Sequence, residues 1–149
     1  MVLQKIQYQN LSPKQQEIYN FQKIASVLAD YGFNCIKLSD DWQGADFLAY
    51  HVNGMDTLKV QLKSRVHVAK KYQNKNLFLA FPIGGDWYLV EHDELLNLVS
   101  NNTIWLNSVA WNKTGAYSSG SINRQLKEAL QQYALTCHRQ CKNDPLTAM

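Results

Sequence analysis

The dipeptide Asn53-Gly54 separates two segments in which apolar and polar residues alternate, Ala45 to His51 and Met55 to Ser64. Asn-Gly strongly favours a β-hairpin, because a type I′ turn needs positive φ at both central residues. We therefore predict two strands joined by a two-residue turn, with facing residue numbers that sum to 107. This register places Asp46 opposite Gln61.

The same register sorts the hairpin into two faces. One face is apolar and is predicted to lie in the core; it carries Ala45, Phe47, Ala49, Leu58, Val60 and Leu62. The other carries Asp46, Gln61 and Lys63. Facing Cβ atoms lie about 5 Å apart and diagonal ones about 7 Å apart, so a carboxylate, a carboxamide and an ammonium converge. An ordinary Asp–Lys pair on a surface hairpin is the alternative interpretation.

A helix is predicted over 13–31. Ser12 can cap it, Gln15 completes a capping box, and Pro13 suits the first turn. Glu17 heads a stripe of otherwise apolar residues at helical spacing: Phe21, Ile24 and Leu28. A buried carboxylate needs a partner, so Glu17 either joins the polar hairpin face or pairs with a lysine near the helix end.

The remaining segments predict a single domain, 1–149, with a core over about 12–137 and a frayed tail over 142–149. Further strands are predicted over 33–38, 77–82, 87–91 and 103–105, and helices over 92–99 and 121–139. Loops are predicted over 39–44 and 111–120, with a loop or short helix over 66–76. This order favours a mixed β-sheet flanked by helices, class α/β (α+β).

Composition and charge narrow the class of protein. Apolar residues make up 46% of the 149 residues, and no apolar stretch is long enough to cross a membrane. Three cysteines cannot form a closed set of disulfides, so we expect a cytoplasmic, intracellular protein.

The charge is unevenly distributed along the chain. The segment from Thr57 to Gly85 holds six basic and no acidic residues, which leaves 15 − 6 = 9 basic and 12 acidic residues elsewhere. Such a segment suits a polyanion bound on one face; a solvated basic loop is equally compatible.

The motif Gly44-Ala45-Asp46-Phe47, followed by Gln61-Leu62-Lys63 and preceded by a helix bearing Glu17, resembles the PD-(D/E)XK nuclease superfamily. The resemblance covers roughly residues 12–92 and implies the restriction-endonuclease-like fold. Ala45 stands where the family has proline, and Gln61 where it usually has glutamate. Gln-x-Lys variants are known in Mrr-like restriction nucleases and in some intron homing endonucleases, and the chain is most similar to cyanobacterial intron-encoded homing endonucleases.

The resemblance implies a metal-dependent DNA endonuclease. Phosphodiester hydrolysis needs a hard cation, here Mg²⁺ or Mn²⁺, to neutralise developing charge and to acidify a water molecule. Asp46 would be the principal ligand, helped by the Gln61 amide oxygen and the Leu62 backbone carbonyl. Because Gln61 is neutral, Glu17 would restore the missing charge, directly or through water. Lys63 would orient the attacking water.

Double-stranded DNA is the implied partner, bound by a homodimer or homotetramer, since one small active site cuts only one strand. Basic side chains are expected to contact phosphates; they are Lys59, Arg65, Lys70, Lys71, Lys75 and Lys113. The loop over 111–121 has groups that suit base reading, although a plain surface loop is favoured.

Other functions remain open at this stage. A restriction nuclease or a Holliday-junction resolvase would use the same core. A non-catalytic DNA-binding module with a decayed site is the alternative of another class, since loss of a carboxylate at Gln61 is how such sites decay. Cys137, His138 and Cys141 suggest a metal, but no convincing fourth ligand for a structural zinc site lies nearby.

Overall fold

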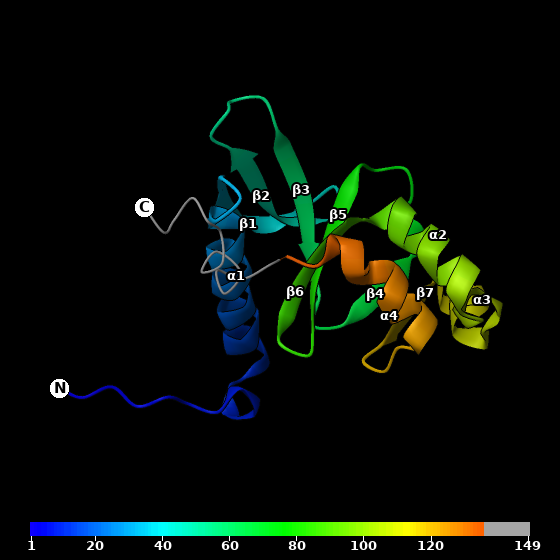
Figure 1. The fold of residues 1–149 in the computed structure, drawn as a ribbon, viewed down its shortest axis with the longest axis horizontal. Helices are drawn as coiled ribbons and strands as arrows, with labels where there is room; N and C mark the ends of the chain where they lie inside the picture. The colour runs from blue at the N-terminus through cyan, green and yellow to red at the C-terminus, as the bar shows by residue number, and fades with distance from the viewer. Residues whose placement is uncertain (136–149) are drawn as a thin grey trace, which may run out of the picture.

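The computed structural model describes residues 1–135, and its centre is a five-stranded mixed sheet in the order β1-β2-β3-β5-β6 (Figure 1). The strands are Phe33–Trp42 (β1), Ala45–His51 (β2), Thr57–Leu62 (β3), Leu77–Ile83 (β5) and Asp86–Glu91 (β6). β3 and β5 run parallel, and the other neighbours are antiparallel. The predicted mixed sheet is confirmed.

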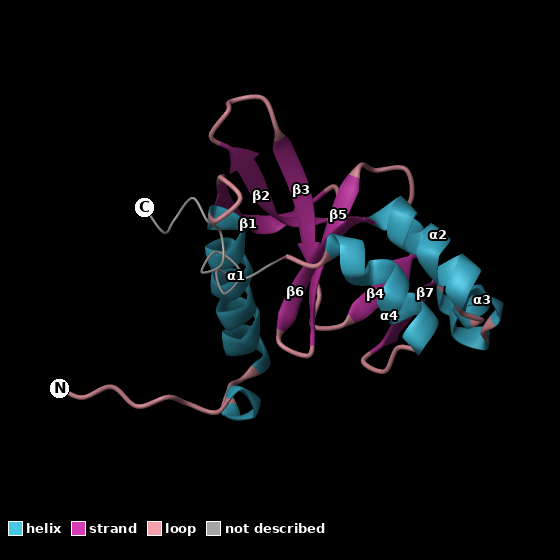
Figure 2. Ribbon diagram, viewed as in Figure 1, coloured by secondary structure: helices cyan, strands magenta, loops and turns pink. Residues whose placement is uncertain are grey.

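Helices and a second, smaller sheet surround this sheet. The helices are α1 (Pro13–Ala29), α2 (His92–Asn102), α3 (Val109–Thr114) and α4 (Arg124–Leu130). β4 (Val66–Ala69) pairs antiparallel with β7 (Ala116–Ser119). Figure 2 shows α1 on one side of the central sheet and the other helices with β4 and β7 on the other. No helix within residues 1–135 combines the length and the apolar character needed to cross a membrane.

Two apolar clusters hold these layers together. Ile24 and Leu28 of α1 pack against one sheet face with Phe47, Ala49 and Val60. The other cluster joins the sheet to α2, α4 and β4; its members include Val68, Leu79, Val90, Leu95 and Leu126. Side chains alternate along β5 between the two clusters, so this strand is covered on both faces. Ala45 is buried as predicted, but it belongs to the second cluster.

The predicted hairpin register is confirmed. The facing pairs are Phe47–Val60, Leu48–Lys59, Ala49–Leu58 and Tyr50–Thr57. The turn itself is wider than predicted: the His51 N–H donates to the Asp56 carbonyl at 2.8 Å, and in this turn only Gly54 has positive φ. Asn53 instead accepts the Met55 N–H through its side chain. The wider loop is still centred between residues 53 and 54, which is why the register is unchanged.

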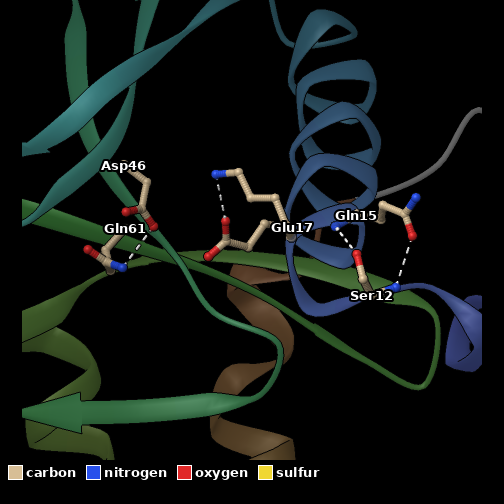
Figure 3. A network of polar contacts seen from close by, with 6 residues as sticks. Ser12, Gln15, Glu17, Asp46 and Gln61 are labelled. Atoms are coloured by element: carbon tan, nitrogen blue, oxygen red, sulfur yellow. Dashed lines mark hydrogen bonds and ion pairs between the residues drawn. The ribbon is translucent and has the colours of Figure 1, made fainter.

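The start of α1 also follows the sequence. The Gln15 N–H donates to Ser12 Oγ at 3.3 Å, and the Ser12 N–H donates to Gln15 Oε1 at 3.0 Å, which completes the capping box (Figure 3). The helix ends at Ala29, two residues before the predicted end, and Gly32 follows with φ of 83°.

Several predicted loops contain regular structure. β1 continues to Trp42 through the segment 39–42, and β4 lies within 66–76. β7 lies within 111–120, and α3 begins at Val109 and extends into the same segment. β4 and β7 have four residues each and pair across about fifty intervening residues, so local periodicity does not reveal them.

Further predictions were wrong at the end of the chain. Instead of a strand over 103–105, Thr103 Oγ1 donates to the Val99 carbonyl and ends α2. The last helix is capped by Asn123 and not by Ser121. The predicted extension of this helix is also wrong, because the α-helix ends at Leu130 and a 3₁₀ turn follows over Gln131–Tyr133. The rest of the predicted helix (136–139), the group of Cys137, His138 and Cys141, and the tail over 142–149 lie outside the described residues.

Phe47 tests the core on the α1 side. Its side chain is fully buried, so Phe47→Ala is expected to lower the free energy of unfolding by about 3–5 kcal/mol in urea denaturation. Ile36→Ala, at a position 52% exposed on the neighbouring strand, is the matched control and should change stability by less than about 0.5 kcal/mol. Equal effects of the two substitutions would contradict this assignment of the core.

Candidate active site

The central feature of the site is a hydrogen-bonded acid–amide pair on adjacent strands. Gln61 Nε2 of β3 donates to Asp46 Oδ2 of β2 at 2.8 Å, and the Leu62 N–H donates to the same oxygen at 2.9 Å (Figure 3). Asp46 is half-buried and Gln61 is 6% exposed. Two of the three side chains that the hairpin register placed together, Asp46 and Gln61, are therefore in direct contact.

The other half of the Gln61 amide has no partner. A carboxylate only accepts hydrogen bonds, so Asp46 requires the amide to present its NH₂ group and to turn its oxygen away. That oxygen, Gln61 Oε1, is buried and accepts no hydrogen bond from the described residues. An unsatisfied buried acceptor costs about 1–3 kcal/mol, and an amide oxygen in this position is chemically able to bind a cation.

Lys63 follows directly after β3 and remains tied to the sheet, because its N–H donates to the Ala80 carbonyl at 2.9 Å. Its Nζ lies 5.8 Å from the centroid of the buried Tyr72 ring, a cation–π distance. Burial lowers the pKa of Lys63, and the nearby Asp46 charge opposes this. Burial likewise raises the pKa of Asp46, against the Leu62 N–H and the Lys63 charge. Burial therefore disfavours the charged form of both groups, and the attraction between the two charges opposes this effect.

A hollow of about 490 Å³ adjoins this pair and extends to α1. Glu17 lines it, as the helix stripe led us to expect. However, the Glu17 side chain is 62% exposed, and its Oε2 pairs with Lys14 Nζ at 3.1 Å (Figure 3). The lysine partner that the sequence analysis left open is thus present, and no hydrogen bond links Glu17 to Asp46 within residues 1–135.

The hollow also receives a bulge of β1 that the sequence analysis missed. Lys37 faces Phe47 and Trp42 faces Ala45, so the four residues 38–41 stand opposite the single residue Asp46. Bulges bend a strand and redirect side chains, and they are frequent beside active sites. The bulge brings Asp41 into the wall of the hollow, together with Lys37 at its base. The Asp-Asp-Trp run was interpreted as a loop because it lacks strand alternation.

A glycine turn closes the bulge. Asp41 Oδ1 accepts the Gly44 N–H at 2.7 Å, and Gly44 has φ of 86°. A Cβ at this position would lie 3.1 Å from Leu77 and 3.3 Å from Tyr72, so only glycine fits.

The basic residues divide between the neighbourhood of Lys63 and other surfaces. Lys71 Nζ lies 5.1 Å from the Tyr72 ring that also carries Lys63, and Arg65 acts electrostatically on the adjacent His67. Lys59 binds Gln43 Oε1 at 3.1 Å beside Trp42. Lys70 lies over Trp111 at 5.4 Å. Within residues 1–135 no contact relates Lys75 or Lys113 to the site.

His92 anchors the strand that carries His67. Its buried ring accepts the Ala69 N–H at Nε2, at 3.1 Å, while Nδ1 lies 3.3 Å from Asp93 Oδ1. This arrangement requires a neutral ring with its proton on Nδ1. Nothing in the sequence marked His92 for this role.

The donors at the pair suit a hard cation. Carboxylate, amide and backbone carbonyl oxygens are the ligands that Mg²⁺ and Mn²⁺ prefer. No three His, Cys, Asp or Glu side chains among residues 1–135 gather closely enough to hold a metal ion by themselves. The oxygen set of Asp46, Gln61 and Leu62 fits magnesium, which commonly takes one or two carboxylates and completes its shell with water.

Comparison with known proteins gives no family model and no curated protein that matches the chain. Several solved structures are similar, and two of them are the following. Hjc, a Holliday junction resolvase from the archaeal hyperthermophile Archaeoglobus fulgidus, is 12% identical; the match covers 51% of this chain and 72% of that chain with a TM-score of 0.41. The other, the bacterial homing endonuclease I-Ssp6803I, is 14% identical over 92% of this chain and 96% of that chain, with a TM-score of 0.46.

The element order that the motif led us to expect is present in this chain. The β2–β3 hairpin carries Asp46 and Gln61, Lys63 follows it, and β3 pairs in parallel with β5.

His67 provides a test of the charge cluster. Burial lowers its pKa to about 4, and the neighbouring cationic or titratable groups add to this; they are Lys63, Lys71, His92 and Arg65. In the unfolded chain His67 regains its ordinary pKa near 6.5 and binds a proton first. The contribution of the neutral His67 ring to the free energy of unfolding is therefore fully present above pH 6.5. It is lost as the pH falls towards 4, and the loss is at most about 3 kcal/mol.

Urea denaturation of the wild type and His67→Gln between pH 4 and 8 measures this contribution. The difference in unfolding free energy between the two proteins should change with pH in that window and be constant above it. A difference independent of pH would show that His67 titrates normally.

Proposed function

We propose that this protein is a metal-dependent DNA endonuclease that hydrolyses phosphodiester bonds in double-stranded DNA. The observation that carries the proposal is the Asp46–Gln61 pair beside the sheet-anchored Lys63. The buried amide oxygen of Gln61 has no partner in the part of the chain that the structure describes. An acid, a neutral oxygen donor and an ammonium at the wall of one hollow match the requirements of phosphodiester hydrolysis.

Mg²⁺, with Mn²⁺ as a substitute, is the proposed cofactor. Asp46 would hold it as the principal ligand, with Gln61 Oε1 and the Leu62 carbonyl as neutral ligands. When bound, the cation supplies charge neutralisation for the phosphate in the transition state. Glu17, on the α1 side of the hollow, is proposed as an outer acidic group that reaches the site through water.

Lys63 is proposed to orient the attacking water and to donate a hydrogen bond to the phosphate. The Ala80 carbonyl fixes its backbone, and the Tyr72 ring limits where its ammonium can lie. Because the side chain is partly buried, its charge acts in a medium of lower polarity than water, where it stabilises a developing anion more strongly.

We propose that DNA reaches the hollow across the basic segment. The proposed phosphate contacts nearest the site follow β3 in the chain; they are Arg65, Lys70 and Lys71. Lys59 extends the positive surface along β3 itself. More distant phosphate contacts are proposed at Lys75 and Lys113. Such contacts position the duplex and do not read its sequence. One site per chain cuts one strand, so we propose a homodimer or homotetramer acting in the cytoplasm.

Among nuclease types we propose a sequence-specific homing endonuclease, on the basis of the Gln61-Leu62-Lys63 motif. Restriction and junction resolution use the same core chemistry. A cleavage-site map separates them: homing requires one long target, restriction a short recurrent one, and resolution a branched substrate.

The proposal predicts that catalysis and binding separate in two variants. Asp46→Asn and Lys63→Ala should bind duplex DNA as the wild type does, yet cut supercoiled plasmid in Mg²⁺ on the order of 10²-fold more slowly or worse. Lys127→Ala, on the exposed surface of α4, is the matched lysine control and should cut normally.

The products of this assay also report on assembly and on the competing function. A dimer should produce linear plasmid together with nicked circles, whereas accumulation of nicked circles alone would contradict paired sites. If the wild type and both variants bind equally and none nicks DNA with any divalent metal, the protein is a binding module with a decayed site.

Salt dependence tests the proposed DNA path. In an Asp46→Asn background, Arg65→Ala and Lys71→Ala should each weaken binding and reduce the slope of log affinity against log salt by about 1. Lys127→Ala should leave the slope unchanged. Fluorescence anisotropy over a series of salt concentrations provides the measurement, and unaltered slopes in both variants would place the duplex elsewhere.

A further inference from the structure

We infer that Asp41, carried into the hollow by the β1 bulge, is a second acidic ligand of the cation held by Asp46 and Gln61. The inference rests on the proposed cation site and adds to it a residue that lies outside both the hairpin and α1. Gln61 is neutral, whereas a glutamate at this position would add a negative charge. In our proposal Asp41 supplies that missing charge.

The first support is the backbone. Four residues of β1 stand opposite Asp46 alone, so the edge strand is pushed outward around that side chain. Asp41 is the last residue of the bulge, and its carboxylate is fixed by the Gly44 N–H at 2.7 Å. That bond occupies Oδ1, while Oδ2 accepts no hydrogen bond from residues 1–135. One oxygen is thus anchored and the other is available.

The second support is the electrostatic environment. Asp41 acts on Asp46, on Lys63 and on the Tyr72 hydroxyl, all of which border the site. Its neighbour Asp40 also lines the hollow but is absent from the charges that act on Asp46 and Lys63. Two carboxylates that repel each other beside a half-buried lysine form a region that a divalent cation stabilises.

The independent sign of a ligand is again Gln61. Its side chain is 94% buried and lines the hollow together with Asp41 and Asp46, and its Oε1 has no hydrogen-bond partner among residues 1–135. Two carboxylate oxygens and one amide oxygen suit Mg²⁺ or Mn²⁺, with water and phosphate in the remaining positions. Glu17 is the competing source of charge, but its Oε2 is engaged with Lys14 Nζ at 3.1 Å.

The chain offers a clean substitution for the test. Asp41→Asn keeps an oxygen that can accept the Gly44 N–H, so the turn is retained and only the charge is removed. Asp40→Asn makes the same change of net charge one residue away, and Glu17→Gln removes the competing acid. Binding of Mn²⁺ is measured without DNA by electron paramagnetic resonance, and plasmid cleavage is titrated separately with Mg²⁺.

We expect Asp41→Asn to weaken Mn²⁺ binding roughly tenfold and to raise the half-saturating Mg²⁺ for cleavage by a similar factor. Asp40→Asn should change Mn²⁺ binding less than twofold, and Glu17→Gln, which removes an acidic group that acts through water, should weaken it less than Asp41→Asn does. Unchanged binding in Asp41→Asn, a larger loss in Glu17→Gln, or no Mn²⁺ binding by the wild type would each overturn the inference. Mn²⁺ binding that depends on Asp41 in a protein that cuts no DNA would uphold the inference and reject the nuclease.

Discussion

The hydrogen bond between Gln61 and Asp46 determines how the site can work. It joins β2 to β3 through side chains, fixes one carboxylate oxygen with help from the Leu62 N–H, and turns the amide oxygen away from every protein donor in residues 1–135. A glutamate at this position would repel Asp46, whereas glutamine can bind it. The glutamine therefore organises the site before any cation arrives, at the expense of one negative charge.

The rest of the fold supports this pair from both sides. Phe47 and Val60, the neighbours of Asp46 and Gln61 along their strands, are fully buried against α1, which prevents the hairpin from slipping by one residue. On the other side Tyr72 lies beneath Lys63 and beside Gly44, and β4 is held by His92. The part of the basic segment that follows β3 is therefore held in place next to the site.

The sequence predicted those parts that depend on local pattern. The alternation around Asn53-Gly54 located Asp46 opposite Gln61 correctly even though the turn is not type I′, because a wider loop on the same centre keeps the register. The capping box located the start of α1. In contrast, β4 and β7 are too short to show a period, and the β1 bulge interrupts the alternation that identifies a strand. The bulge is the reason that the sequence did not reveal Asp41. The partner of Glu17 stayed open because helical spacing shows which side of the helix a residue occupies, but not how far its side chain lies from Asp46 or from a lysine.

The account depends most on the claim that the free oxygen of Gln61 is a cation ligand, and crystals grown with Mn²⁺ test it directly by anomalous diffraction. We expect one strong anomalous peak about 2.1 Å from both an Asp46 oxygen and Gln61 Oε1, the distance that a magnesium-like ion requires. A well-ordered site with no peak, in which Gln61 Oε1 accepts a hydrogen bond from water or protein, would contradict the account.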